Sequence, residues 1–243
     1  MMYRIFAVWL FIGLLLLLFW ELPEWLYFAN SIFMILYTAA VLVESKTYFF
    51  SNIKINKTFA VLFIIGATTL LIEALSVYTG FPFGEYEYTT MLGYHVLGVP
   101  FTIAIAWVGF IINSTMISTQ QNKWLRALET GVWVVFIDLI LDPVALAWDF
   151  WQWDNGGFYY GIPATNFITW FFLAAILSLL LPLQKGTKPS VQSYRLLELM
   201  FLFFGLLALK KGFVLVACLA VLFILLTEGR RVLDSSRKKA LVH

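Results

Sequence analysis

Six apolar segments of roughly membrane-spanning length constrain this chain more than any other feature of its sequence. A helix needs about 20 apolar residues to cross the hydrocarbon core of a bilayer, and closed barrels are the only other structure that spans it. Charged residues make up only 12% of the 243-residue chain, about half the share expected in a soluble domain. We therefore predict an all-α polytopic membrane protein that forms a single transmembrane domain, residues 1–243. The apolar segments are residues 3–20, 25–43, 57–79, 96–117, 126–148 and 163–183.

A seventh apolar region, residues 194–228, is interrupted by Lys210, Lys211 and Gly212. The whole region is too long for one membrane span, and each half is slightly short for one. The interruption predicts two helices joined by a tight turn. The expected fold is a helical bundle of eight transmembrane helices, with seven as the alternative.

The basic residues predict how this bundle is oriented. Lys and Arg favour the cytoplasmic side in short connections between membrane helices. If the amino terminus is cytoplasmic, eight helices place 14 of the 16 basic residues on that side and leave only Lys210 and Lys211 outside. Seven helices would instead place the basic tail, residues 229–243, outside. We therefore expect a multi-pass protein of the cell membrane, with both termini and the basic tail in the cytoplasm.

Two connections on the expected external side differ from ordinary loops. TGFPFGEYEYTTMLGYH joins the third and fourth helices, and WDFWQWDNGGFYYGIP joins the fifth and sixth. Both combine Gly and Pro with acids and many aromatic residues, a composition typical of binding loops or lids. An aromatic belt at the membrane interface explains any one of these rings, but it does not require the acids beside them.

Three acids lie inside the apolar segments: Glu73, Asp138 and Asp142. Ionisable groups at this depth are costly, and they usually face protein or water and have a function. Asp138 and Asp142 are four residues apart and so share one face of a helix. Pro143 cannot donate a backbone hydrogen bond, which leaves the carbonyl of Leu139 free and predicts a kink. We expect the three acids to line one chamber beneath the two aromatic loops.

The two loops end in the same way. Leu97-Gly98-Val99-Pro100 precedes the fourth helix, and Tyr160-Gly161-Ile162-Pro163 precedes the sixth. Each turn follows an acid-bearing helix and an aromatic loop, which suggests a weak internal duplication of the two helix pairs. Glu129 and Glu198 lie outside this pattern, near the expected cytoplasmic helix ends, where water or a basic neighbour explains them.

The other residues of the chain leave few chemistries for the three acids. His95 and His243 are the only histidines, too few for a multi-histidine iron site, and the sequence contains no phosphate-binding loop. A carboxyl group in an apolar site favours its neutral form, especially beside a second carboxyl. Such an acid can protonate an isolated alkene, aromatic faces can stabilise the cation, and an ionised partner can deprotonate the attacking water. We expect neither a cofactor nor a metal.

Two long stretches of the chain match a known family. One runs from Glu73 to Pro100, with GFPFGEYEY and LGVP, and the other runs from Asp138 to Trp170, with GFYYGIP followed by Asn166. Because of these two stretches, residues 60–175, the expected catalytic core, resemble the membrane-integral CruF-type carotenoid hydratases. The resemblance implies addition of water across the terminal 1,2 double bond of an acyclic carotenoid ψ end. The implied partners are this carotenoid, water, membrane lipids and other carotenoid-pathway enzymes, with no nucleic acid.

The same resemblance implies roles for individual residues. Glu73, Asp138 and Asp142 form the catalytic set, with Asp138 favoured as the proton donor because it lies deepest, and Asp142 or Glu73 positioning water. The loops and the adjoining helices form the pocket for the end of the carotenoid. The expected substrate-binding residues are Phe83, Tyr86, Tyr88, His95, Trp148, Trp153, Asn155, Tyr160, Asn166 and Trp170.

Other functions fit the same acids. A proton-coupled transporter could use them as a relay, although the cytoplasmic half offers no matching set of intramembrane charges. A non-catalytic membrane protein that binds a carotenoid or another lipid would need no reactive acid. The acids could also connect helices through hydrogen bonds, each worth about 1 kcal/mol.

Overall fold

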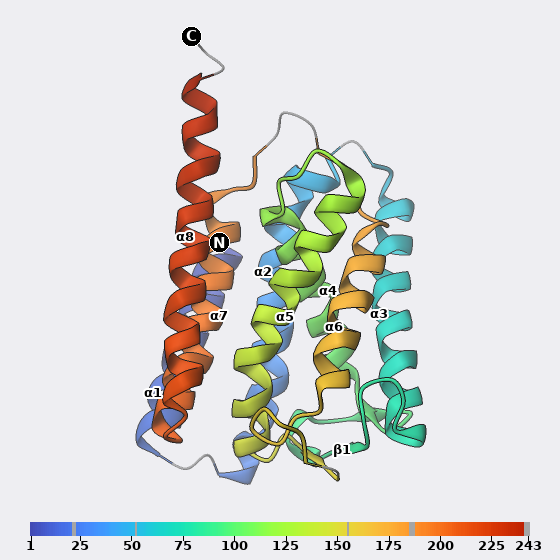
Figure 1. Ribbon diagram of the computed structural model, residues 1–243, viewed down its shortest axis with the longest axis vertical. Helices are drawn as coiled ribbons and strands as arrows, with labels where there is room; N and C mark the ends of the chain where they lie inside the picture. The colour runs from blue at the N-terminus through green and yellow to red at the C-terminus, as the bar shows by residue number, and fades with distance from the viewer. Residues whose placement is uncertain (21–22, 52, 155, 185–187, 241–243) are drawn as a thin grey trace.

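The computed structural model describes residues 1–20, 23–51, 53–154, 156–184 and 188–240. In these ranges eight α-helices form an antiparallel bundle (Figure 1). Each helix falls on an apolar segment that the sequence predicts, and residues 211–213 separate the last two, so the described residues form eight helices and not seven. The helices are α1 Met2–Phe19, α2 Phe28–Phe49, α3 Ile55–Thr79, α4 Phe101–Ile117, α5 Lys123–Ala147, α6 Ala164–Ser178, α7 Val191–Lys210 and α8 Val214–Ala240.

Helix length and composition identify an all-α membrane protein. Within the described ranges, five helical segments are long and apolar enough to cross a membrane: α1, Glu24–Phe49, α3, α5 and α7. The apolar helices α4 and α6 are shorter, with 17 and 15 residues. α1 runs toward the end of the bundle that carries β1, and α8 runs away from it (Figure 1). Eight crossings and a cytoplasmic location of both termini stay predictions.

α4 begins five residues later than predicted because the residues before it form a tight turn, and α6 ends at Ser178, five residues earlier than predicted, where the chain turns through 3₁₀-type hydrogen bonds. β2 (His95–Val96) pairs with β3 (Val99–Pro100) around Leu97 and Gly98, whose φ angles are 53° and 78°. Tyr160 and Gly161 have φ angles of 50° and 87° inside a matching turn. Positive φ at both central residues is the geometry of a type I′ hairpin turn, in which glycine is unstrained. The shared backbone geometry supports the internal duplication suggested by the sequence.

The two aromatic loops are joined to each other by β structure. β1 (Tyr86–Tyr88) follows α3, and it pairs antiparallel with β4 (Trp151–Trp153), which follows α5. Tyr86 lies opposite Trp153, and Tyr88 lies opposite Trp151. The sequence patterns predict no strands here. We call this part of the molecule, residues 80–100 and 148–163, the hairpin end of the bundle; it lies at the bottom of Figure 1.

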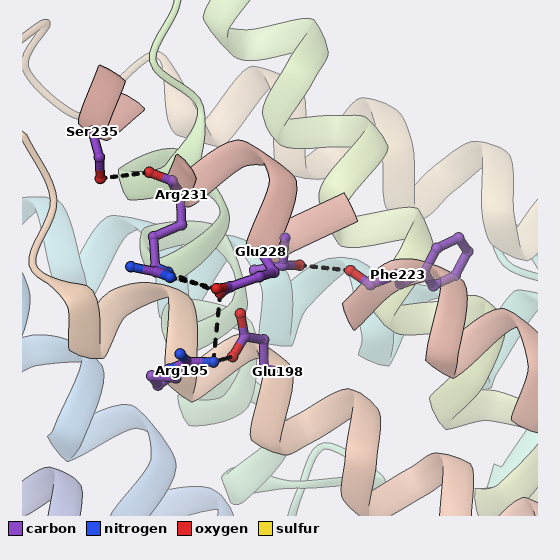
Figure 2. A network of polar contacts seen from close by, with 7 residues as sticks. Arg195, Glu198, Phe223, Glu228, Arg231 and Ser235 are labelled. Carbon is purple, nitrogen blue, oxygen red and sulfur yellow. Dashed lines mark hydrogen bonds and ion pairs between the residues drawn. The ribbon is translucent and has the colours of Figure 1, made fainter. Parts of the chain in front are cut away.

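Charged side chains at the other end of the bundle are paired. Glu198 of α7 accepts a hydrogen bond from Arg195 at 2.5 Å, and Glu228 of α8 contacts Arg195 at 3.5 Å and also binds Arg231 (Figure 2). Glu129 of α5 forms an ion pair with Arg230 of α8, with 3.0 Å between the nitrogen and the oxygen. The prediction that basic neighbours explain Glu129 and Glu198 is therefore confirmed.

Candidate active site

Glu73 is buried near the hairpin end of α3, where 3% of its surface is exposed. Its Oε1 atom accepts a hydrogen bond from Trp107 Nε1 of α4 at 2.8 Å. Its Oε2 atom accepts a bond from the Tyr88 hydroxyl at 3.0 Å and a second bond from the Tyr86 hydroxyl. Three donors from α4 and β1 thus hold the carboxyl group in one orientation.

Tyr86 and Tyr88 keep their hydroxyl protons at any ordinary pH. Burial, together with the nearby Glu73 carboxyl, raises the pKa of each phenol well above its usual value. Both groups are therefore available as permanent donors toward Glu73.

Asp138 and Asp142 of α5 form a second buried acid group. Asp138 is fully buried, and Asp142 is 2% exposed. The side-chain nitrogen of Asn166, which lies in the first turn of α6, donates to Asp138 Oδ2 at 2.9 Å and to Asp142 Oδ2 at 2.8 Å. One amide therefore bridges the two carboxyl groups, as their spacing on one helix face permits.

The carbonyl group that Pro143 leaves free has a specific partner. α5 continues through Pro143 to Ala147, and the hydroxyl of Tyr159 donates to the oxygen of Leu139 at 2.9 Å. The free carbonyl predicted from the sequence is confirmed, and the second aromatic loop satisfies it. The loop is thereby attached to the acid-bearing part of α5.

This attachment gives a test of local stability. Tyr159→Phe removes the only hydroxyl that bonds the Leu139 carbonyl among the described residues, and we expect it to lower the free energy of unfolding by about 1 kcal/mol. The measurement is thermal unfolding of the detergent-purified protein. Tyr160→Phe is the matched control, because it removes the hydroxyl of the adjacent ring. Equal effects of the two substitutions would contradict the assigned bond.

The two acid groups meet at a small cavity of about 30 Å³. Glu73 and Asp142 both line it, whereas Asp138 does not. The volume is enough for one or two water molecules, since about 10–15 Å³ is the lower limit for one. The remaining lining residues come from α2, α4, α5, α6, β1 and β4: Met34, Tyr86, Tyr88, Ile103, Ala106, Trp107, Phe110, Leu141, Trp151, Trp153, Asn166 and Trp170.

Aromatic rings form most of the wall opposite the acids. Trp107 and Trp170 pack with 4.2 Å between ring centroids, and Tyr86 packs on Trp153 at 4.7 Å. The indole nitrogen of Trp153 is buried and has no hydrogen-bond partner among the residues described, and the same is true of Asp138 Oδ1. The site therefore offers ring faces together with a free donor from Trp153, while Asp138 Oδ1 lies outside the cavity lining.

The structure gathers half of the predicted substrate-binding residues at this cavity. Tyr86, Tyr88, Trp153, Asn166 and Trp170 line it directly. Phe83 lies behind it, in ring contact with Tyr86 and Trp107. Trp148 lines a neighbouring apolar cavity, whereas His95 and Tyr160 line neither, and Asn155 lies outside the described residues.

Trp107, Trp151 and Met34 belong to the site but are absent from the predicted set. Trp107 is the one Trp in its apolar segment, and this feature of the sequence could have identified it as a site residue. Trp151 stands in the aromatic loop, and only its pairing with Tyr88 reveals its position. Met34 lies on α2, outside the predicted core of residues 60–175, and its sequence context carries no signal.

The buried acids differ from those at the opposite end in having no basic partner. Within the described part of the chain, no ion pair involves Glu73, Asp138 or Asp142. The same residues contain no group of three His, Cys, Asp or Glu side chains arranged to hold a metal ion. Neutral donors therefore support these carboxyl groups, and buried ionisable residues of this kind are candidates for a functional site.

Comparison with known proteins identifies the family of this chain. The chain matches the family described as Carotenoid biosynthesis protein over residues 29–227. It belongs to this family. The match extends well beyond residues 60–175 and includes α2, α7 and half of α8, so the resemblance recognised in the sequence covers more of this family member than predicted.

One relative has a name that is more specific than the description of the family. This family member is similar to bisanhydrobacterioruberin hydratase of Haloarcula japonica, with 33% identity over 116 residues. The match covers 45% of the present chain and 39% of the relative, so the chain spans about two fifths of that protein's length. No solved structure matches the chain.

Proposed function

We propose that this family member is a carotenoid hydratase that adds water across the terminal 1,2 double bond of an acyclic carotenoid ψ end. The observation that carries the proposal is the placement of Glu73 and Asp142 at one buried cavity with aromatic walls and no basic neighbour. The name of the Haloarcula relative supports hydration as the reaction class. A pair of carboxyl groups can supply both the acid that protonates a carbon–carbon double bond and the base that accepts a proton from the attacking water.

In the first step of the proposed reaction, Asp142 acts as the acid. Its proton passes to C2 while the π electrons of the double bond form the new C2–H bond, which leaves a tertiary cation at C1. Asp142 is the choice because it faces the cavity, whereas Asp138 lies behind it and shares the Asn166 amide. Two carboxyl groups this close hold a shared proton readily. Asp138 then positions Asp142 and stabilises its protonated form. Its depth in the helix alone had favoured Asp138 itself as the proton donor.

In the second step water adds to C1. The oxygen of a cavity water forms the C1–O bond, and one of its protons passes to the carboxylate of Glu73. Three hydrogen-bond donors stabilise the negative charge of the carboxylate and offset part of the cost of ionising it in a buried site. The faces of Trp107 and Trp170 stabilise the intervening cation. The cycle closes when the proton returns from Glu73 to Asp142 through water, so the net change is addition of one water molecule.

The decisive experiment uses the full chain in a host that accumulates an acyclic carotenoid and has no hydratase. We expect a new carotenoid that is heavier by the mass of one water for each end hydrated, with a tertiary hydroxyl group. Chromatography with mass detection measures it, and a host carrying the empty vector is the control. Retention of unmodified carotenoid by the purified protein, without new product, would favour the non-catalytic binding protein instead.

A further inference from the structure

A second, larger cavity lies beside the acid cavity. Its volume is about 290 Å³, and it is lined by α1, the start of α2, the end of α5, α7 and residues of both aromatic loops. Among the described lining residues, only Asn30 has an amide or charged side chain, and its nitrogen is already bonded to the carbonyl of Met91 at 3.1 Å. The lining residues are Trp9, Ile12, Gly13, Leu16, Leu17, Leu26, Phe28, Ala29, Asn30, Phe33, Met34, Leu92, Leu141, Ala145, Trp148, Phe150, Trp151, Phe203, Phe204 and Leu207.

The two cavities share part of one wall. Met34, Leu141 and Trp151 line both of them. Leu141 immediately precedes Asp142 on α5, and Trp151 lies opposite Tyr88, which donates to Glu73. A group in the larger cavity is therefore separated from the acids by one layer of side chains. Met34 is the most adaptable member of this layer, because an unbranched thioether side chain repacks easily.

The larger cavity also reaches the outer surface of the bundle. Ile12 of α1 and Phe28 at the start of α2 both line it, and they are 52% and 53% exposed. The exposed faces of membrane helices contact lipid. An apolar molecule dissolved in the bilayer can thus enter the cavity sideways, between α1 and α2, without crossing water.

We propose that this cavity binds the apolar chain of the substrate and delivers its end to the acids past Met34. The inference rests on the proposed function for the identity of the chain as an isoprenoid. At about 290 Å³ the cavity is near the lower limit of about 300 Å³ for ligand pockets, so it accommodates one terminal segment while the rest of a long carotenoid lies in the membrane. The acid cavity is too small to hold that segment.

Gly13 allows the proposal to be tested with little damage to the fold. It lines the larger cavity, and a Cβ atom added there would meet no other atom within 4 Å. Gly13→Leu and Gly13→Phe therefore add a large side chain at the lining of the cavity, and replacing Gly within a helix favours the helix by up to about 1 kcal/mol. Gly229→Leu and Gly229→Phe are the matched controls, because Gly229 lies on α8, outside both cavities, and a Cβ atom there also meets nothing within 4 Å.

The experiment measures two quantities for the full-length wild type and each variant. One is the total polyene, substrate plus product, that copurifies with the protein from the carotenoid-producing host, and the other is the fraction hydrated. Both Gly13 variants are expected to retain at least about tenfold less polyene, with the larger loss for Phe, at unchanged protein level and with a melting temperature no lower than that of the wild type. The Gly229 variants are expected to match the wild type.

The outcomes separate this inference from the proposed function. Polyene binding that is lost in the Gly13 variants, without any hydration by the wild type, would uphold the cavity and reject the hydratase. Hydration and binding that persist in both Gly13 variants would overturn the cavity assignment. A phospholipid acyl chain has similar chemistry, so bound lipids are extracted and analysed as well. Loss of a phospholipid alone from the Gly13 variants, with polyene binding unchanged, would also overturn it.

Discussion

Asp142→Asn is expected to reduce carotenoid hydration by about 10²- to 10⁴-fold, the usual contribution of a positioned acid or base. The amide keeps the size of the side chain but has no proton acidic enough to transfer to an alkene. Asp142 is the member of the α5 pair that lines the acid cavity, and Asn166 holds its carboxyl in place. The measurement is the fraction of hydrated carotenoid in the producing host, normalised to the protein level in the membrane.

Two further variants test the role assigned to Asp142. Asp154→Asn makes the same chemical change at an exposed position of the second aromatic loop and is expected to leave hydration unchanged. Asp138→Asn is expected to shift the pH dependence of the hydration rate. It should also reduce this rate less than Asp142→Asn does, because Asp138 acts through Asp142 and does not line the cavity. An inactive Asp138→Asn beside an active Asp142→Asn would reverse the two roles.

Much of the helical architecture was predictable from hydrophobicity alone. The apolar segments located all eight helices, and the Lys210–Gly212 interruption located the turn between α7 and α8. The start of α4 was less accurate because residues 95–100 are apolar enough to continue a helix, and the end of α6 was less accurate because residues 179–183 are also apolar. The backbone of residues 95–100 is decided by Gly98, whose positive φ angle turns the chain back on itself.

Sequence predicted the candidate site only at residues whose type is unusual in an apolar helix, such as an acid or a proline. Buried carboxyl groups are rare, so Glu73, Asp138 and Asp142 stood out, and Pro143 revealed the free carbonyl that Tyr159 occupies. The pairing of β1 with β4 was not visible, because a three-residue strand has too little periodicity to recognise. The larger cavity was also hidden, since apolar residues that line a cavity look the same in sequence as those that fill a core.

Glu73→Gln is expected to reduce hydration by about 10²-fold or more, because the amide cannot accept the proton that the attacking water releases. It also places an amide nitrogen where the carboxyl group accepts hydrogen bonds from Trp107 and two tyrosines. Glu87→Gln is the matched control: Glu87 lies between Tyr86 and Tyr88 on β1 and is exposed. Hydrated product is measured as for Asp142→Asn, and retained activity in Glu73→Gln would contradict the assigned base.

A structural role for Glu73 predicts a different pattern from a catalytic one, and the tyrosines distinguish the two. Tyr86→Phe and Tyr88→Phe each remove one donor but keep the carboxyl group. If Glu73 only connects α3 to α4 and β1, each substitution should lower the melting temperature and the activity together, in proportion to the bonds lost. If Glu73 takes the proton from water, Glu73→Gln should lose far more activity than its loss of stability explains. In the tyrosine variants, activity should still fall only in proportion to melting temperature, because the carboxylate that accepts the proton is still present.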